Sequence, residues 1–285
     1  MNPYSKLVSD FVHLVAEGKS LPLGGLPPAP RPSPAADAPT ALFFAPHPDD
    51  ETILGGLALR LLREAKWKVI DIAVTLGSLK ERKAGRLQEL RNACQFLGFS
   101  LEPAAPNGLD AVRPATRAND PEAWLRMVGL ISALLQKHRP KVIFLPHDLD
   151  WNGTHVGVHF LVMDALEAAY DIPCHLVEME FWGQMQTPNL MVQYTPEDVA
   201  DLVAATSFHV GEVQRNPYHV LIPAWMLDNV RRGAELVGGQ GGAAPAFLFA
   251  QLFRLRRWTG SQVENCYAGG RFLPASENPA GLFAI

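Results

Sequence analysis

The chain has 285 residues, of which 48% are hydrophobic and 19% are charged, and its formal net charge is −4. This composition is typical of a globular enzyme with a sizeable core. The mild negative charge argues against a nucleic-acid or membrane-surface partner, and no apolar run reaches the ~20 residues of a transmembrane helix.

The first 40 residues are predicted to form a short helix followed by an arm. Apolar residues at helical spacing favour a helix over residues 4–17, and frequent Pro and Gly make residues 19–40 an extended arm. The helix could pack on its own domain or on a partner chain, which leaves a homo-oligomer open. Because the segment lacks the long apolar core of a signal peptide, and three scattered cysteines indicate no disulfide framework, we expect a cytoplasmic protein.

From residue 41 onward, predicted strands and helices alternate. Strands are expected at 41–46, 69–75, 141–145, 174–181 and 189–194, and helices at 52–65, 80–97, 121–138, 156–170, 196–206 and 223–237. This alternation predicts a Rossmann-like α/β domain over 41–260, with a mostly parallel sheet and helices on both faces. Its site should lie at the carboxyl ends of the strands. Residues 261–285 show no pattern and are expected to form a tail.

The first predicted strand runs directly into a group of ionisable residues, His47, Asp49, Asp50 and Glu51. One alternative is an ordinary acidic helix start, because free N–H groups and the helix dipole favour carboxylates there. A single Asp would be enough for a cap, however, and a cap does not require a His. A His and a carboxylate on one tight turn suit a divalent metal, and a second carboxylate beside them suits a base.

A second cluster follows the strand predicted at 141–145, where residues 146–159 contain three His and two Asp. His155 and His159 are four residues apart and would share a helix face, a spacing that can bind a metal. We favour His155 as the ligand because it stands at the start of the helix, nearer the loop. His159 would then cap or pack under the helix, although His159 or His147 remains an alternative ligand.

The segment Pro46-His47-Pro48-Asp49-Asp50-Glu51 resembles the (A/P)HPDDE motif of the PIG-L/LmbE-like zinc-dependent N-deacetylases, and the resemblance extends over roughly residues 40–255. It implies that His47 and Asp50 bind the metal, together with His155, and that Asp49 is the general base. Where the family has a His that is thought to stabilise the oxyanion, this chain has Asn152. We therefore expect Asn152 to be the oxyanion donor, unless it only holds its loop, in which case His147 or His159 would donate.

Weaker similarities suggest further substrate contacts. Arg86 matches an Arg-x-x-Glu of the family, although it could equally lie on a solvated helix face. His209 lies where the family often has a His, and Trp151 could offer a flat ring to a sugar. The substrate-binding candidates are Arg86, His147, Trp151, His159 and His209.

The resemblance implies a hydrolase that removes an N-acyl group, most simply acetyl, from a small amino sugar or sugar-like molecule. Zn²⁺ or another divalent metal would be the cofactor, and a metal-bound water would be the nucleophile. Two alternatives stay open. The chain could act on a non-sugar amide or a phosphorylated amino sugar, or it could be a catalytically silent binding protein that keeps the metal.

Overall fold

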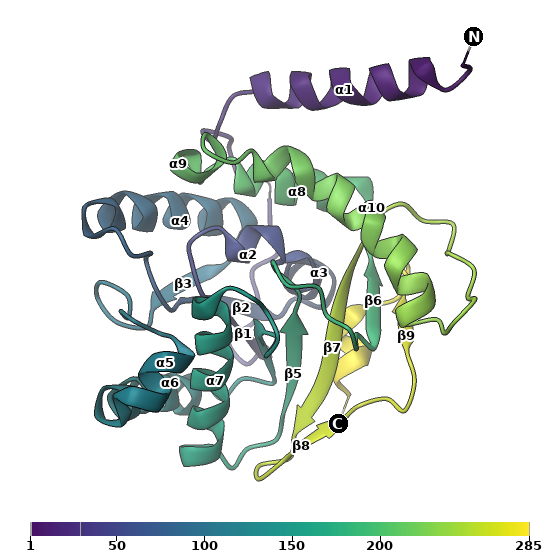
Figure 1. The fold of residues 1–285 in the computed structure, drawn as a ribbon. Coiled ribbons are helices and arrows are strands. Elements are labelled where there is room, and N and C mark those ends of the chain that lie inside the picture. Colours follow the sequence, from purple (N-terminus) through teal and green to yellow (C-terminus); the bar gives the residue numbers. More distant parts are fainter. Residues whose placement is uncertain (1, 29, 285) are drawn as a thin grey trace.

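The computed structural model describes residues 2–28 and 30–284 and shows an α/β fold built around one sheet (Figure 1). The sheet has the order β3-β2-β1-β4-β5-β7-β6-β9, and β8 pairs with β7. The first five strands in this order are parallel, whereas β7 is antiparallel to both its neighbours. The strands are β1 (Thr40–Ala45), β2 (Lys68–Ala73), β3 (Ser100–Pro103), β4 (Val142–Pro146), β5 (Cys174–Met179), β6 (Leu190–Gln193), β7 (Ala250–Trp258), β8 (Val263–Asn265) and β9 (Arg271–Leu273).

Helices cover both faces of this sheet, and β1 shows why. Its side chains alternate, so that Phe43 joins one buried cluster with α3, α4, α8 and α10, while Leu42 and Phe44 join the other with α6 and α7. The predicted Rossmann-like fold is therefore confirmed. The helices are α1 (Ser5–Ser20), α2 (Asp50–Ile53), α3 (Gly56–Ala65), α4 (Lys83–Leu97), α5 (Pro114–Asn119), α6 (Pro121–His138), α7 (Gly153–Ala169), α8 (Pro196–Thr206), α9 (Val210–Val213) and α10 (Tyr218–Leu236), with 3₁₀ turns η1 (Lys80–Arg82) and η2 (Pro279–Phe283).

Several helix predictions differ from the structure in their bounds, and three of the differences have a clear physical reading. The helix predicted at 52–65 is two helices, α2 and α3, separated at Leu54 and Gly55. Helix α7 begins earlier than predicted because the Asn152 side chain caps it. Helix α10 begins at Tyr218 and carries Pro223 inside it, whereas the prediction placed that proline in the first turn, where proline is best tolerated.

The C-terminal part of the chain contributes strands that the sequence analysis did not predict. Strand β7 lies between β5 and β6, and β9 pairs in parallel with β6. The guanidinium of Arg60 on α3 is fully buried and donates to the carbonyl of Glu277 at 2.7 Å. Residues after 260 thus contribute strands to the main sheet. The predicted domain boundaries, including a separate tail over 261–285, stay predictions.

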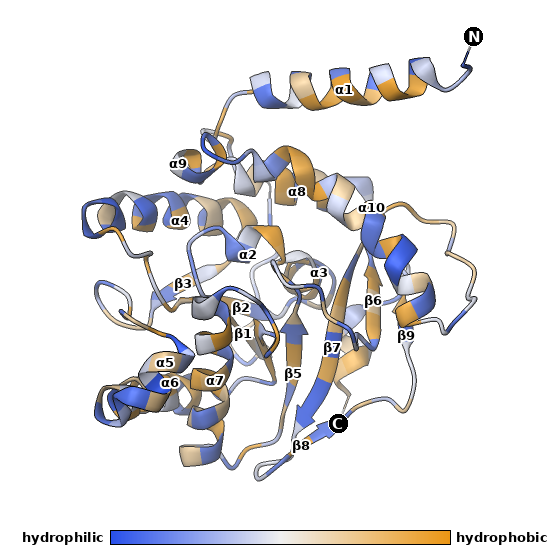
Figure 2. Ribbon diagram, in the orientation of Figure 1, coloured by the Kyte–Doolittle hydropathy of each residue, from blue (hydrophilic) through white to orange (hydrophobic). Residues whose placement is uncertain are grey.

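The N-terminal helix α1 lies on the outside of the molecule (Figure 1), where Gly18 lies close to Val220 of α10, and none of its described residues is buried. Apolar and polar residues alternate along it (Figure 2), which gives it an exposed apolar side that includes Leu7, Phe11 and Leu14. The arm that follows α1 is anchored to the domain by an ion pair between Arg31 and Asp201 at 2.8 Å. Among the described helices, none combines the length and apolar character needed to cross a membrane.

Candidate active site

Three side chains from the two predicted clusters meet at the carboxyl ends of β1 and β4. His47 Nδ1 lies 3.2 Å from His155 Nε2, and each of these nitrogens lies 3.5 Å from the same oxygen, Oδ2 of Asp50. His47 and Asp50 come from the turn after β1, and His155 comes from the first turn of α7. The strands β1 and β4 are neighbours in the sheet, which explains why residues more than one hundred positions apart converge.

This triangle has the dimensions of one face of a zinc coordination tetrahedron. Tetrahedral ligands at a zinc–nitrogen distance of ~2.0–2.1 Å lie about 3.3–3.4 Å apart, and the three edges here are 3.2, 3.5 and 3.5 Å. Burial lowers the pKa of His47, which keeps its imidazole neutral as a ligand must be. Burial alone would raise the pKa of Asp50, but His155 and His47 lower it overall, so its carboxylate is charged. The donor set therefore fits a divalent metal.

Asp49 precedes α2 but does not cap it. Its side chain makes no capping hydrogen bond, and its backbone has the left-handed value φ 117°, which is uncommon for a residue other than glycine. Arg86 approaches its carboxylate at 4.0 Å and donates to the carbonyl of Pro48 at 2.9 Å. Burial and the charge of Asp50 raise the pKa of Asp49 well above its usual range, and Arg86 acts in the opposite direction. The acidic residues after β1 are therefore not a simple helix start.

A buried pair behind Asp49 holds this turn. Glu51 accepts a hydrogen bond from the backbone N–H of Asp49 at 2.9 Å, and its other oxygen lies 2.7 Å from Nε2 of His209. Both Glu51 and His209 are fully buried. His209 was predicted as a substrate contact, but it lies behind the turn and contacts Glu51. No local sequence pattern reports this pairing, because the two residues are 158 positions apart.

Asp150 stands behind His155 and had no role in the sequence analysis. Its Oδ2 lies 3.6 Å from Nδ1 of His155, the nitrogen that faces away from Asp50. The backbone N–H groups of Asn152 and Trp182 donate to this carboxylate at 2.8 and 3.0 Å and fix its position. A carboxylate in this place orients an imidazole and raises its basicity toward a metal. The sequence signal for this role was the position of Asp150, after a predicted strand and five residues before His155.

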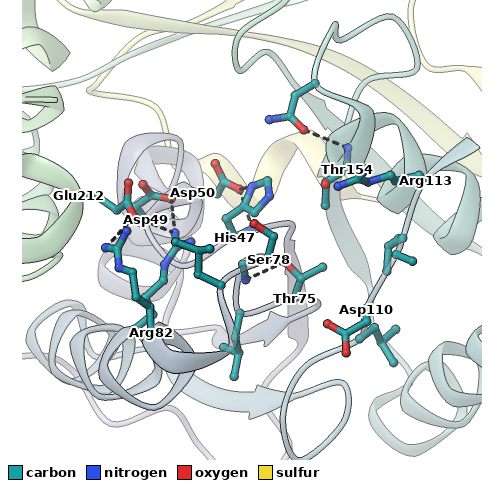
Figure 3. A pocket seen from close by; sticks show the side chains of 18 of the residues that line it. His47, Asp49, Asp50, Thr75, Ser78, Arg82, Asp110, Arg113, Thr154 and Glu212 are labelled. Atoms are coloured by element: carbon teal, nitrogen blue, oxygen red, sulfur yellow. Dashed lines mark hydrogen bonds and ion pairs between the residues drawn. The ribbon is translucent and has the colours of Figure 1, made fainter. Parts of the chain in front are cut away.

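A cavity of about 660 Å³ opens over the triangle (Figure 3). His47 and Asp49 line it from the turn between β1 and α2, Asp50 lines it from the start of α2, and the loops after β2 and β4 supply other walls. Three arginines, Arg82, Arg86 and Arg215, lie within 4 Å of the buried carboxylate of Glu212 at one side. The cavity is therefore polar, with a carboxylate and fixed cations close to the three candidate ligands.

Asn152 and Trp151 also line this cavity. The side-chain oxygen of Asn152 accepts from the backbone N–H of Thr154 at 2.9 Å, which caps α7. This contact uses the oxygen and not the NH₂ group, so loop holding and donation are compatible. Trp151 is 75% exposed at the cavity mouth, where its Nε1 donates to the carbonyl of Trp182 at 2.8 Å.

The two other candidate histidines, His147 and His159, are buried, and neither is among the described residues that line this cavity. His147 Nε2 donates to the carbonyl of Gly183 at 2.7 Å, and its Nδ1 accepts from the N–H of Leu149 at 3.3 Å. His159 Nδ1 donates to the carbonyl of Pro146 at 2.9 Å. Both imidazoles hold backbone in place beneath the site, and their substrate contacts stay a prediction.

The sequence over residues 42–166 matches the family model of PIG-L, described as GlcNAc-PI de-N-acetylase. This stretch belongs to the PIG-L family. The recognition made from the motif is thereby confirmed, and the PIG-L stretch contains all three residues of the triangle. No curated protein matches the chain in sequence.

Solved structures share the fold of the PIG-L stretch and the strands after it. N,N′-diacetylchitobiose deacetylase from Pyrococcus horikoshii is 14% identical, with a TM-score of 0.52 over 90% of this chain and 94% of that one. The A40926 pseudoaglycone deacetylase is 15% identical, with a TM-score of 0.57 over 79% of this chain and 100% of that one. The 4-carboxy-2-hydroxymuconate hydratase GalB from Pseudomonas putida KT2440 is 15% identical, with a TM-score of 0.54 over 76% and 95%. At these identities the likeness shows the fold, which carries more than one chemistry.

Proposed function

We propose that this protein is a metal-dependent hydrolase that removes an N-acetyl group from an amino sugar or a sugar-like molecule. The observation that carries the proposal is the His47–Asp50–His155 triangle at the cavity, with the buried carboxylate of Asp49 beside it. The PIG-L match and the activities named for two of the structural neighbours support deacetylation over other hydrolyses.

His47, Asp50 and His155 would hold the metal, with zinc as the first candidate because two imidazoles and one carboxylate suit it. A divalent metal in this place supplies a Lewis acid for the amide carbonyl and lowers the pKa of a coordinated water. Asp150 would keep His155 in the orientation and tautomer that leave Nε2 free for this role.

Asp49 would act as general base and then as general acid. It takes one proton from the attacking water as the new C–O bond forms, and it returns that proton to the nitrogen as the C–N bond breaks. The products are acetic acid, which ionises to acetate, and the free amine. Burial favours the protonated form of Asp49, which makes its carboxylate a stronger base than an exposed aspartate. Glu51 and His209 position it through the backbone of the turn.

Asn152 would donate its NH₂ group to the oxyanion of the tetrahedral intermediate, since its oxygen is already used in the cap. Arg86 would bind a polar group of the substrate, because it reaches the cavity beside Asp49. Trp151 would cover a sugar face at the mouth of the cavity.

The test is acetate release by purified protein loaded with one equivalent of zinc, from N-acetylglucosamine, its glycosides and 6-phosphate, and N-acetylated amines without a sugar. We expect release from the sugars, removal of activity by a chelator, and recovery on adding zinc. Metal-dependent release from the non-sugar amides alone would favour the alternative substrate class. Stoichiometric zinc with no release from any compound would favour a binding protein.

A further inference from the structure

The helix α1 leaves one apolar side uncovered. Five apolar residues of its first three turns, which we call the α1 seam, are 54–66% exposed: Leu7, Val8, Phe11, Val12 and Leu14. The last turn of α1 meets the domain, where Gly18 lies close to Val220 on the first turn of α10. A helix of 16 residues is marginally stable by itself in water, so the seam needs a surface to pack against.

An apolar groove of about 360 Å³ lies between α10 and the loop that joins α10 to β7. It is lined from α10 by Leu227, Val230 and Ala234, and from the loop by Phe247 and Leu248. Two charged residues of α10 also line it. Leu227 and Leu248 are 48% and 62% exposed. Exposed apolar surface of this kind is typical of a protein-binding site, and we call it the α10 groove.

The seam and the groove match in spacing when their two helices run antiparallel. Steps of four and three residues separate Leu7, Phe11 and Leu14. Steps of three and four residues separate the residues that α10 contributes to the groove, so the two series coincide when one of them is reversed. Leu14 then lies against Leu227 at one end, and Leu7 lies against Ala234 at the other. This alternation is the pattern by which paired helices interdigitate their side chains.

The α1 of the same chain is out of register with this groove. From the contact between Gly18 and Val220, eleven residues back along α1 and eleven residues on along α10 bring Leu7 to Arg231. This position is three residues short of Ala234 and sets a leucine against a guanidinium. In the single chain the seam and the groove accordingly both stay exposed. A second copy of the chain is free of this constraint.

Charge and area favour a second copy as the occupant. The charged residues of α1 are Lys6, Asp10, Glu17 and Lys19, so the helix has no net charge, whereas helices that lie on membranes are rich in Lys and Arg. Complete burial of a Leu, Val or Phe side chain removes about 60–120 Å² of apolar surface from water. Two seams in two grooves would therefore bury on the order of 1,000 Å², which a specific interface needs.

We propose that two copies of this chain form a symmetric dimer in which the α1 seam of each copy lies in the α10 groove of the other. The contact is the same in both directions, so it closes with two copies. The dimer does not depend on the proposed function, because neither surface contains a residue of the proposed metal site.

A disulfide between two different chains tests the contact. Chains carrying Leu14→Cys are mixed with chains carrying Leu227→Cys and oxidised, so that a cross-link between these two positions, identified by peptide mass, has to be intermolecular. We expect this cross-link. The control mixes His13→Cys with Leu227→Cys and should give none, because residue 13 lies on the side of α1 away from the seam. A cross-link within the double variant, with none in the mixture, would overturn the dimer in favour of closure of α1 on its own chain.

The second test is the molar mass of the full-length chain, measured by light scattering over a dilution series. We expect a dimer whose dissociation constant rises at least about tenfold in Leu7→Glu, because each copy loses one buried leucine. Leu125→Glu on α6 is the matched control, since Leu7 and Leu125 are both 66% exposed, and it should leave the dimer unchanged. Thermal unfolding shows whether both variants fold.

A monomer throughout the series, or an oligomer that Leu7→Glu leaves equally stable, would overturn the proposal. Binding of a monomer to vesicles of phosphatidylglycerol and phosphatidylcholine, lost in Leu7→Glu, would assign the α1 seam to a lipid surface instead. Neither test measures acetate release, so a failure of the dimer and a failure of the deacetylase proposal are read separately.

Discussion

The carboxylate of Asp150 faces Nδ1 of His155 at 3.6 Å, while the other nitrogen of that imidazole points at Asp50 and His47. Within the described residues, Nδ1 has no hydrogen-bond partner, so Asp150 is the charged group that can fix the ring. Asp150→Asn should therefore weaken zinc affinity by about 10–100-fold, measured by competition with a chromogenic chelator. Asp164→Asn, a carboxylate on the outer part of α7, is the control. Unchanged affinity in Asp150→Asn would show that packing alone orients His155.

The metal ligands can be tested by an isosteric change. His155 stands at the start of its helix, as expected, but it is fully buried there, so Ala would add a cavity cost to the loss of a ligand. His155→Gln should retain the fold and lose stoichiometric zinc, measured by elemental analysis beside thermal unfolding. His159→Gln, one helical turn further along α7, should keep the metal. Full zinc occupancy in His155→Gln would exclude it as a ligand.

Asp49→Asn should keep the metal and lower kcat by on the order of 10²–10⁴, because an amide cannot accept the proton of the attacking water. Asn tolerates positive φ better than most residues, so the turn should be preserved at this φ of 117°. Metal content and kcat are measured on the same preparation. Loss of zinc in Asp49→Asn together with its retention in Asp50→Asn would exchange the two roles.

The two roles of Asn152 separate in a pair of variants. Asn152→Asp keeps the oxygen that caps α7 but removes the NH₂ donor, and Asn152→Ala removes both. If Asn152 is the oxyanion donor, both should lose about 10²–10³ in kcat, with KM little changed, while Ala alone costs about 1 kcal/mol of unfolding free energy. Near-normal kcat in Asn152→Ala would show that Asn152 only holds its loop, since His147 and His159 are turned to backbone groups beneath the site.

A buried histidine on β5 predicts acid sensitivity. Burial lowers the pKa of His175 to about 4, below its ordinary value of 6.5. The unfolded chain therefore takes up this proton first, and the free energy of unfolding should fall as the pH drops from 6.5 to 4, by on the order of 3 kcal/mol. Urea unfolding across this range should show a smaller fall in His175→Gln. His13→Gln on the exposed helix α1 is the control, and parallel pH curves for His175→Gln and wild type would contradict the assignment.

The sequence analysis located the site better than it located the sheet. A short continuous apolar run followed by ionisable residues identified β1 and β4, and both predicted clusters lie at their carboxyl ends. Strand β7 was missed because Arg254 and Arg256 interrupt its apolar pattern, and their charges are neutralised by Glu178 from β5, a partner that only the fold provides. The pairing of Glu51 with His209 was missed for the same reason, since no local pattern reports a contact between distant segments.

The position of β7 has a consequence for the order in which the chain folds. Strands β5 and β6 are complete at Met179 and Gln193, long before β7 begins at Ala250, yet each bonds to β7 and not to the other. Until that strand arrives, both present open backbone groups at their edges, which are prone to pairing with another chain. The parallel half of the sheet, β1 to β5, can form first from nearer segments, whereas its closure depends on long-range contacts that form slowly. During synthesis a chaperone that shields the β5 edge would therefore protect this protein until residue 258 becomes available.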